Sequence, residues 1–400
     1  MKRDALLLIA LLTLPLCACA QGNGGSPLSS SLASSSSSEE KKESISLIDK
    51  IEGGEVDLVY APARNYLNSE NPASVLAEAT SRPGDNTDPL TLRWKVNNGK
   101  GRYELEIATD ESFADVYATY DDLRPSISSL DVYNLVPGTY YYRVKGENAV
   151  SETDSFSIKG TLRTIDTGDA IINMRDLGGW RIDKTHRVKY SLLYRSASWA
   201  GMDKTAESRL KALGMKTELD VRYGSGSNDY SASEHPLAGV SFLNLGMGQY
   251  DAILPGAGRY YESAKANIKA IFEALSRKDN YPLAFHCSAG ADRTGTLAYL
   301  ISGLLGVGYS DLCKDYELTS FYNSKRWRSN IADGEFDDSG VMQDDESNYV
   351  AFGLLHSKMM ELYSTEEGTL SSAIENYLVS ACSLSKATID SIKAILIEEC

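Results

Sequence analysis

A cysteine, an arginine and several small residues lie close together in the stretch HCSAGADRTG, residues 286–295. The apolar run PLAF precedes this stretch, and an apolar helical pattern follows from residue 294. A strand, a loop and a helix are therefore expected in that order. A loop that opens a helix directs backbone N–H groups into one concavity, and the helix end adds partial positive charge. Because this field favours thiolate over thiol, the stretch predicts that Cys287 is a nucleophile beside an anion site.

The residues that follow the cysteine suit a tetrahedral oxyanion. Arg293 lies six positions after Cys287 and can return to bind two oxygens through its planar guanidinium. The nucleotide-binding pattern GxxxxGK[ST] is absent from this stretch. Small side chains leave room for the anion while their backbone N–H groups face it, at Ser288, Ala289, Gly290 and Ala291.

Helices and strands alternate around this stretch from about residue 165. Residues 203–213 predict a helix that ends before Gly214, and residues 215–222 then predict a strand. Apolar residues at helical spacing predict another helix just upstream of the central strand: Ile268, Ile271, Phe272 and Leu275. This order predicts an α/β domain over residues 165–400, with its site at the carboxyl end of the strand before Cys287.

Residues 55–162 have a different pattern. The segments TLRWKV, RYELEIATD and GTYYYRVKG alternate apolar and polar residues, and turn signals separate them. This pattern predicts an all-β sandwich. Trp94 followed by NLVPGTYYYRVKG resembles a fibronectin type III domain. We expect Trp94 to pack in the core, and a docking face for carbohydrate or protein is the alternative.

The N-terminus predicts an export signal, with Lys2 and Arg3 before a short apolar run. LPLCACAQ, residues 14–21, resembles the bacterial lipobox, which implies a signal peptide over residues 1–18 and a lipid on Cys19. Cys17 fits less well because bulky Leu16 precedes it, and an ordinary signal peptide is the alternative. Residues 19–50 are rich in serine and predict a flexible linker that tethers the folded domains to the membrane of a bacterial cell envelope.

Charge and cysteine content limit the partners of the chain. The net charge of −15 argues against nucleic acid or an anionic membrane surface as the main partner. Neither a disulfide framework nor a zinc pattern is present, so we expect no metal and no cofactor. A bridge is left open among Cys313, Cys382 and Cys400.

Together, these motifs carry a family resemblance. HCSAGADRTG resembles the signature of the cysteine-dependent protein tyrosine phosphatases. Four further segments, in order around it, resemble the bacterial tyrosine phosphatase family that includes secreted mycobacterial and listerial enzymes with dual lipid and protein activity: NMRDLGGW (173–180), LLYRSASW (192–199), LDVR (219–222) and DYELTS (315–320). The resemblance covers residues 165–400.

The resemblance implies a two-step mechanism. Cys287 would attack phosphorus to form a cysteinyl-phosphate, which water would then hydrolyse. Arg293 and the backbone N–H groups of residues 288–293 would hold the phosphoryl group. Thr294 would donate a hydrogen bond to the departing thiolate, and His286 would orient the loop from beneath.

A general acid is needed because an alcohol or phenol leaves poorly as its anion. Asp292 is the candidate, because the resembled family carries an aspartate assigned to this role there, and an N-cap carboxylate is the alternative. Asp220 and Asp251 are alternates, although Asp220 could instead pair with Arg222. Two other residues are expected to brace the loop, Arg175 and Asp176.

Relatives often carry a lysine directly before the in-loop aspartate, where this chain has Ala291. Its absence weakens attraction for substrates with several phosphates. We therefore expect an exported phosphatase acting on phosphomonoesters, phosphotyrosine above all, in a phosphorylated protein or small molecule. The alternatives are a phosphoinositide or phytase-like inositol-polyphosphate phosphatase, and a non-catalytic phosphate-binding surface protein.

Two surface segments have open interpretations. A basic cluster after the GGW motif predicts a solvated face, with a substrate-binding rim as the alternative: Lys184, His186, Arg187 and Lys189. The acidic stretch over residues 330–350 predicts a surface insertion or mobile lid, followed by helices to about residue 398.

Overall fold

The structure is a computed structural model that describes residues 42–68, 89–168, 170–223, 235, 237–257, 259–321, 335–336, 342–343 and 348–400. The predicted signal peptide, Cys19 and most of the predicted linker lie outside these residues. The chain divides into two compact units. Unit 1 comprises Met1–Gly54, Thr91–Leu130 and Thr139–Phe156, and unit 2 comprises Glu55–Leu90, Asp131–Gly138 and Ser157–Cys400.

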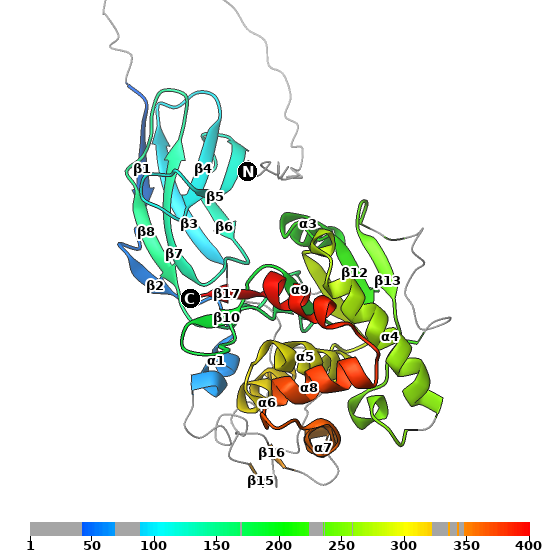
Figure 1. Ribbon diagram of the computed structural model, residues 1–400. Helices are drawn as coiled ribbons and strands as arrows, with labels where there is room; N and C mark the ends of the chain where they lie inside the picture. The colour runs from blue at the N-terminus through cyan, green and yellow to red at the C-terminus, as the bar shows by residue number, and fades with distance from the viewer. Residues whose placement is uncertain are drawn as a thin grey trace, which may run out of the picture. The chain divides into compact units, whose positions relative to one another are not determined.

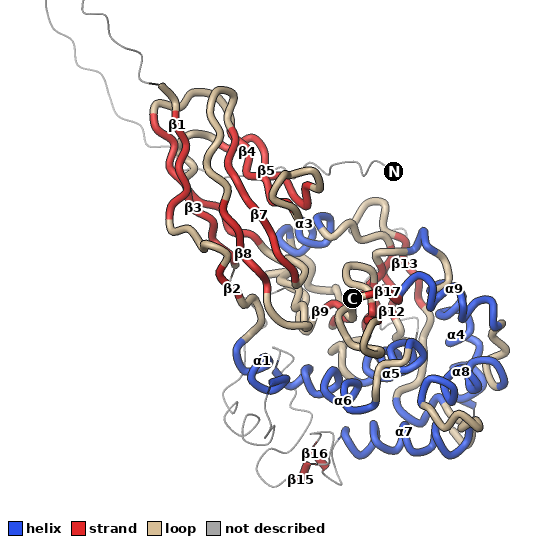
Figure 2. The backbone as a smooth tube through the Cα atoms, turned by 60° about the vertical axis from the view of Figure 1, so that its left-hand side comes forward, coloured by secondary structure: helices blue, strands red, loops and turns tan. Residues whose placement is uncertain are grey.

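The N-terminal region forms two sheets whose strands appear as long red segments in Figure 2. One sheet has the order β1-β3-β6, with β1 Ser44–Ile48, β3 Leu90–Asn97 and β6 Ser129–Val132. The other has the order β2-β8-β7-β4-β5, with β2 Gly54–Val56, β8 Asp154–Ile158, β7 Gly138–Lys145, β4 Tyr103–Ala108 and β5 Val116–Leu123. The all-β prediction is confirmed at this level, and Trp94 packs in the core as expected.

The predicted linker is shorter than expected. Ser44–Ile48 forms strand β1, antiparallel to β3, although the sequence assigns residues up to 50 to the linker. The physical reason is the alternation in SISLI, which buries Ile45 and Leu47 while the serines face outward or lie at the surface. Two apolar side chains on one face are enough to add this segment to the sheet.

Unit 2 holds a five-stranded sheet with the order β13-β12-β14-β11-β9, of which Figure 1 labels β12 and β13. Its strands are β9 Arg175–Asp176, β11 Leu193–Ser196, β12 Thr217–Asp220, β13 Ser241–Asn244 and β14 Leu283–His286. All adjacent pairs are parallel except β9 with β11. In register, Ser196, Asp220 and His286 lie level at the carboxyl ends of three neighbouring strands. The predicted α/β architecture is therefore confirmed.

In the sequence of unit 2, helices precede, separate and follow the strands of this sheet. They are α1 Ala61–Asn68, α3 Lys204–Ala212, α4 Arg259–Leu275, α5 Asp292–Leu305, α6 Tyr309–Leu318, α7 Asn348–Tyr363, α8 Leu370–Ser380 and α9 Lys386–Leu396, with short 3-10 turns η2 Tyr250–Ile253, η3 Lys278–Asn280 and η4 Thr319–Phe321. Helix α5 is apolar around its whole circumference and almost wholly buried, which places the residues before it at the centre of the unit. In the part of the chain that the structure describes, no helix combines the length and apolar character needed to cross a membrane.

Two further sheets of two strands each belong to unit 2. Strand β10 His186–Val188 pairs with β17 Ile397–Glu399, and within the basic cluster Arg187 pairs with Glu398 and His186 with Asp183. Strands β15 Glu335–Phe336 and β16 Met342–Gln343 pair within the acidic stretch, and most other residues of that stretch lie outside the described ones.

The chain enters unit 2 earlier than the predicted start at residue 165. Helix α1 belongs to unit 2, and its Tyr66 ring packs against Phe321 with the ring centroids 5.1 Å apart. The segment Asp131–Gly138 also belongs to unit 2, where Asn134 exchanges hydrogen bonds with the backbone of Asp166. A single boundary near residue 162 therefore does not describe how these two units divide the chain.

Candidate active site

Strand β14 ends at His286 and delivers Cys287 to a loop that leads into α5. The Cys287 side chain is buried, with the residue only 2% exposed. Burial by itself raises the pKa of a thiol, but here other groups outweigh it. Nearby donors, the hydroxyl and N–H of Thr294 and the N–H of Ala291, together with the charge of Arg293, bring the pKa of Cys287 below its ordinary value. The buried thiol is therefore surrounded by donors that favour its thiolate form.

Gly290 fixes the path of this loop. Its φ is +68°, a left-handed conformation that favours glycine. A Cβ atom there would lie 2.5 Å from both the carbonyl carbon and oxygen of Ser196 and 2.7 Å from the nitrogen of Ala197. The loop thus approaches the end of β11 too closely for any side chain at this position.

Polar side chains from the segment before β9 and from β11 brace the loop from behind. Asn173 donates from Nδ2 to the carbonyl oxygens of Ala289, at 3.1 Å, and Gly290, at 3.2 Å. Arg195 Nη2 donates to the same Gly290 oxygen at 2.8 Å. The carbonyl groups of Ala289 and Gly290 thus point toward Asn173 and Arg195. The N–H groups of the loop are then free to face away from these side chains, where an anion would lie.

Asp315 of α6 holds the two arginines behind this loop. Arg175 Nε donates to Asp315 Oδ1 at 2.9 Å and Arg195 Nη1 to Oδ2, while Arg175 Nη1 donates to Asn173 Oδ1 at 2.6 Å. Both guanidinium groups are fully buried. Burial lowers the pKa of Arg195 to about 10, as does the charge of Arg175, while Asp315 acts in the opposite direction. The expected bracing role of Arg175 thus runs through Asn173 and Asp315.

Asp176 lies next to this group but contacts a different turn. It accepts hydrogen bonds from Arg163, from the N–H of Ser191 and from the N–H of Gly178, each at 2.8 Å. These contacts stabilise the GG turn and the start of β11 rather than touching the loop itself.

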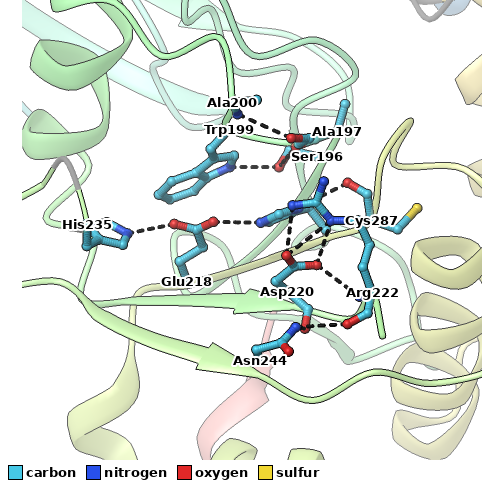
Figure 3. A network of polar contacts seen from close by, with 12 residues as sticks. Ser196, Ala197, Trp199, Ala200, Glu218, Asp220, Arg222, His235, Asn244 and Cys287 are labelled. Atoms are coloured by element: carbon cyan, nitrogen blue, oxygen red, sulfur yellow. Dashed lines mark hydrogen bonds and ion pairs between the residues drawn. The ribbon is translucent and has the colours of Figure 1, made fainter. Parts of the chain in front are cut away.

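His286 ends strand β14 directly before the loop, and its partner Glu218 lies in the network of polar contacts shown in Figure 3. Its Nδ1 lies 3.0 Å from the carbonyl oxygen of Cys287, and its Nε2 lies 2.6 Å from Glu218 Oε1. The second oxygen of Glu218 lies 2.6 Å from Nε2 of His235. Burial lowers the pKa of His286, but the groups around it, Glu218 foremost, raise it by a larger amount. The pKa of His286 therefore lies above its ordinary value. The orientation expected of His286 therefore depends on Glu218, which sequence reasoning missed.

Arg293 and Thr294 form the first turn of α5, directly after the loop. The Thr294 side chain is fully buried, and among the described residues its hydroxyl makes no hydrogen bond within the usual distance and angle limits. The sulfur of Cys287 is the group whose pKa this hydroxyl lowers. Arg293 is partly exposed, so its guanidinium is accessible to an anion.

Asp292 is the first residue of α5, and Ala291 takes the N-cap position. The Asp292 carboxylate oxygen Oδ1 accepts a hydrogen bond from the Tyr250 hydroxyl at 2.6 Å. The side chain thus contacts η2 and does not occupy the N-cap position, which was the alternative for this residue. Its role as the general acid stays a prediction.

The two alternate acids each have a basic partner. Both Asp220 oxygens bond to Arg222, with Nε at 2.9 Å from Oδ1 and Nη2 at 2.8 Å from Oδ2 (Figure 3). Asp251 Oδ2 lies 2.6 Å from Nζ of Lys358 on α7. Asp220 therefore has the structural ion pair that the sequence left open. Asp292, in contrast, directly follows the loop as the first residue of α5.

The remaining cysteines and acidic residues form no second centre in the described part of the chain. Cys313 and Cys382 are buried free thiols and Cys400 is an exposed one, so the bridge that the sequence left open is not formed. In the residues that the structure describes, no group of three or more His, Cys, Asp and Glu side chains is placed to hold a metal ion.

The sequence of unit 2 matches a known family. Residues 167–398, more than half of the chain, match the family described as the tyrosine phosphatase family. A Cupriavidus necator protein named as a candidate tyrosine-protein phosphatase is 30% identical over 164 residues, which cover 37% of this chain and 60% of that protein. A tyrosine-protein phosphatase of Nostoc commune is 25% identical over 141 residues, or 32% of this chain and 48% of that protein. The chain thus aligns with about half of each relative's length.

Two solved structures resemble part of the chain weakly. The core catalytic domain of the PP-IP phosphatase Siw14 from Saccharomyces cerevisiae, in complex with citrate, is 19% identical, with a TM-score of 0.25 over 34% of this chain and 76% of that one. A second structure of the Siw14 catalytic core is 16% identical, with a TM-score of 0.28 over 47% of this chain and 85% of that one.

Proposed function

Because the chain belongs to the tyrosine phosphatase family, we propose that it hydrolyses phosphomonoesters through a cysteinyl-phosphate intermediate. The observation that carries the proposal is the state of Cys287. The thiol is buried, yet the donors around it lower its pKa. A structural buried cysteine has its pKa raised by burial. At Cys382, burial outweighs the opposing influences of Tyr377 and Lys265 and raises the pKa to about 11.

In the first step, the Cys287 thiolate attacks phosphorus, forming the S–P bond while the bond from phosphorus to the ester oxygen breaks. Arg293 and the loop N–H groups bind the non-bridging oxygens and stabilise the charge that they carry in the transition state. The Asp292 carboxylic acid gives its proton to the departing oxygen, so that an alcohol or phenol leaves in neutral form.

In the second step, water attacks phosphorus and the S–P bond breaks. The Asp292 carboxylate, now deprotonated, accepts a proton from the water. The electron pair of the S–P bond returns to sulfur, and the Thr294 hydroxyl donates to the thiolate that forms. Inorganic phosphate then leaves, and the enzyme returns to its starting protonation state.

Phosphotyrosine is the substrate that we favour. Arg293 is the single arginine or lysine in residues 286–295, and it is needed for the transferring phosphoryl group itself. Position 291, where relatives often carry lysine, is a fully buried alanine. Phosphoinositides and inositol polyphosphates, which carry further phosphates, would need cations from elsewhere. They remain the alternative substrates.

We also propose that the protein is exported and anchored by a lipid on Cys19. The support is the sequence alone: a basic start, a short apolar run and a small residue directly before Cys19. Expression in a bacterium with a labelled fatty acid tests the proposal. Label should enter the wild-type protein and the Cys17→Ala variant but not the Cys19→Ala variant, and unlabelled wild-type protein would contradict it.

The activity is tested by phosphate release from four substrates: a phosphotyrosine peptide, a phosphoserine peptide, phosphoinositides and inositol hexakisphosphate. Cys287→Ser should abolish turnover, whereas Cys313→Ser, which alters a buried thiol outside the loop, should not. Preference for the phosphotyrosine peptide would support the substrate assignment. No turnover of any substrate, with vanadate still bound, would overturn the catalytic proposal and favour a phosphate-binding protein.

A further inference from the structure

Tyr250 contacts the first turn of α5 at two points. Its hydroxyl donates to Asp292 Oδ1 at 2.6 Å, and its backbone N–H donates to Thr296 Oγ1 at 2.7 Å. Thr296 Oγ1 in turn donates to the backbone carbonyl of Asp292 at 2.9 Å. Tyr250 therefore fixes both the carboxyl group of Asp292 and the helical turn that carries it.

The backbone of Tyr250 adopts a conformation that is unfavourable for a bulky residue. Its φ is +53°, in the left-handed region. Non-glycine residues persist there only where the surrounding structure holds them, and such positions concentrate at functional sites. Tyr250 is 5% exposed, so its ring is closely packed while its backbone is strained. The contact with Asp292 is one of the interactions that hold Tyr250 in this conformation.

A second tyrosine extends the contact to α6. The hydroxyls of Tyr250 and Tyr316 lie 2.7 Å apart, and the Tyr316 ring stacks on Phe352 of α7 with centroids 4.3 Å apart. Because the single hydroxyl proton of Tyr250 goes to Asp292, Tyr316 is the donor to Tyr250. The hydrogen bonds thus run in one direction, from Tyr316 to Tyr250 to the carboxylate.

We propose that Tyr250 is a positioning residue for the general acid, and that Tyr316 supports it. This inference rests on the proposed function, because it assigns Tyr250 a role through Asp292. When Asp292 transfers its proton to the leaving oxygen, negative charge develops on the carboxyl group, and the Tyr250 hydroxyl already points at it. Donation to that charge favours proton transfer without any movement of the site.

The charged groups near this pair come from several elements. Cys287 and Arg293 lie on the loop and on α5, and the pair of Asp251 with Lys358 joins η2 to α7. None of these groups is altered by replacing a tyrosine hydroxyl with hydrogen. A Tyr250→Phe variant therefore removes the donor to Asp292 while leaving the charges of the site in place.

The test compares two aryl esters with the full-length protein. Phenyl phosphate has a poor leaving group that needs a general acid, whereas 2,4-dinitrophenyl phosphate leaves without one. In Tyr250→Phe, kcat/KM for phenyl phosphate should fall roughly tenfold, while that for the dinitrophenyl ester changes little. Tyr316→Phe should show the same selectivity with a smaller loss. Tyr281→Phe, which removes another buried hydroxyl, bonded to the Leu275 carbonyl, should affect neither ester.

The Asp292→Ala background shows whether Tyr250 acts through Asp292. Adding Tyr250→Phe to Asp292→Ala should cause no further loss with phenyl phosphate. An equal loss on both esters, no loss, or an additional loss in the double variant would overturn the inference. These failures differ from failure of the proposed function, in which the wild-type protein hydrolyses neither ester.

Discussion

At the scale of single residues, the state of Cys287 can be measured directly. Thiolate, not thiol, reacts with iodoacetamide, so the alkylation rate follows the ionisation of the sulfur. Because the surrounding donors lower the pKa of Cys287, the midpoint of its rate profile should lie below the value of about 8.5 for a free cysteine. Mass spectrometry of the peptide that carries Cys287 would follow this thiol alone.

Removing one donor should move that midpoint upward. Thr294→Val keeps the shape of a β-branched side chain but lacks the hydroxyl, so the thiolate loses a nearby donor and the midpoint rises. Thr388→Val, at a hydroxyl near the start of α9, is the matched control and should leave it in place. A midpoint near that of free cysteine in the wild-type protein would refute the described state of Cys287.

Gly290 can be tested with a second glycine that has the same backbone conformation. Gly290→Ala combines a φ of +68° with a clash at Ser196, so phosphatase activity should fall roughly a hundredfold and stability by about 1–3 kcal/mol. Gly214 has a φ of +67° and no atom within 4 Å of an added Cβ, so Gly214→Ala should show the strain without the loss of activity. Equal activity in the two variants would contradict the close approach, as read from phosphate release and urea unfolding.

The sequence could predict the residues of the loop because their chemistry is local. Cys287 and Arg293 are six residues apart, and the small residues between them indicate the cradle. The residues that hold the site are joined only by folding: Glu218 reaches His286 across 68 positions, and Tyr250 reaches Tyr316 across 66. Nothing in the local pattern of either pair signals its partner, so these residues were missed.

At the scale of elements, α6 offers a direct test of how the loop is braced. Burial raises the pKa of Asp315, but Arg175 and Arg195 outweigh it and keep the carboxylate charged. Asp315→Asn would leave two buried guanidinium groups without their shared anion, and we expect a loss of about 3–5 kcal/mol in unfolding free energy. Activity should fall with it, because Arg195 also holds the Gly290 carbonyl.

The control for this prediction lies on the same helix. Asp311 pairs with Lys314 at the surface, 3.3 Å apart, with both side chains about one-third exposed. Exposed pairs of this kind contribute little, so Asp311→Asn should change the unfolding free energy by less than about 0.5 kcal/mol. Urea denaturation of both variants would measure the difference, and similar losses would show that Asp315 is not a special brace.

The sequence predicts helices and strands where apolar residues recur at a clear spacing. It does not predict them where the surrounding composition hides that spacing. The helix before Gly214 and the strand before Cys287 appear at the expected residues, since each has a clear apolar pattern. The sequence assigns strand β1 to the linker because the serine-rich composition continues up to this strand. Only Ile45 and Leu47 distinguish the strand from the linker. Helix α1 is only eight residues long, too short to show a repeated apolar pattern, and its Tyr66 packs on Phe321 of unit 2.

At the scale of the whole molecule, the chain does not pass through its two units in one step. It contributes α1 to unit 2 before most strands of unit 1, and it returns to unit 2 through Asp131–Gly138 before the last strands. Sequence pattern alone suggests one boundary, because each segment is classified by its own periodicity. The assignment of a segment to a core depends instead on which side chains it buries, and Ala63 and Tyr66 are buried with the core of unit 2.

This division predicts that a substitution far upstream of the family region destabilises the catalytic unit. Tyr66→Ala removes a ring that is 2% exposed and packs on Phe321, which should cost about 3 kcal/mol. In calorimetry, vanadate identifies the transition of the catalytic unit, because a ligand of the native state raises its melting temperature. Tyr66→Ala should lower that transition, whereas Leu105→Ala, in a strand of unit 1, should lower the other one. If Tyr66→Ala left the vanadate-sensitive transition unchanged, α1 would not be part of the catalytic core, and the family region alone should then fold with full stability.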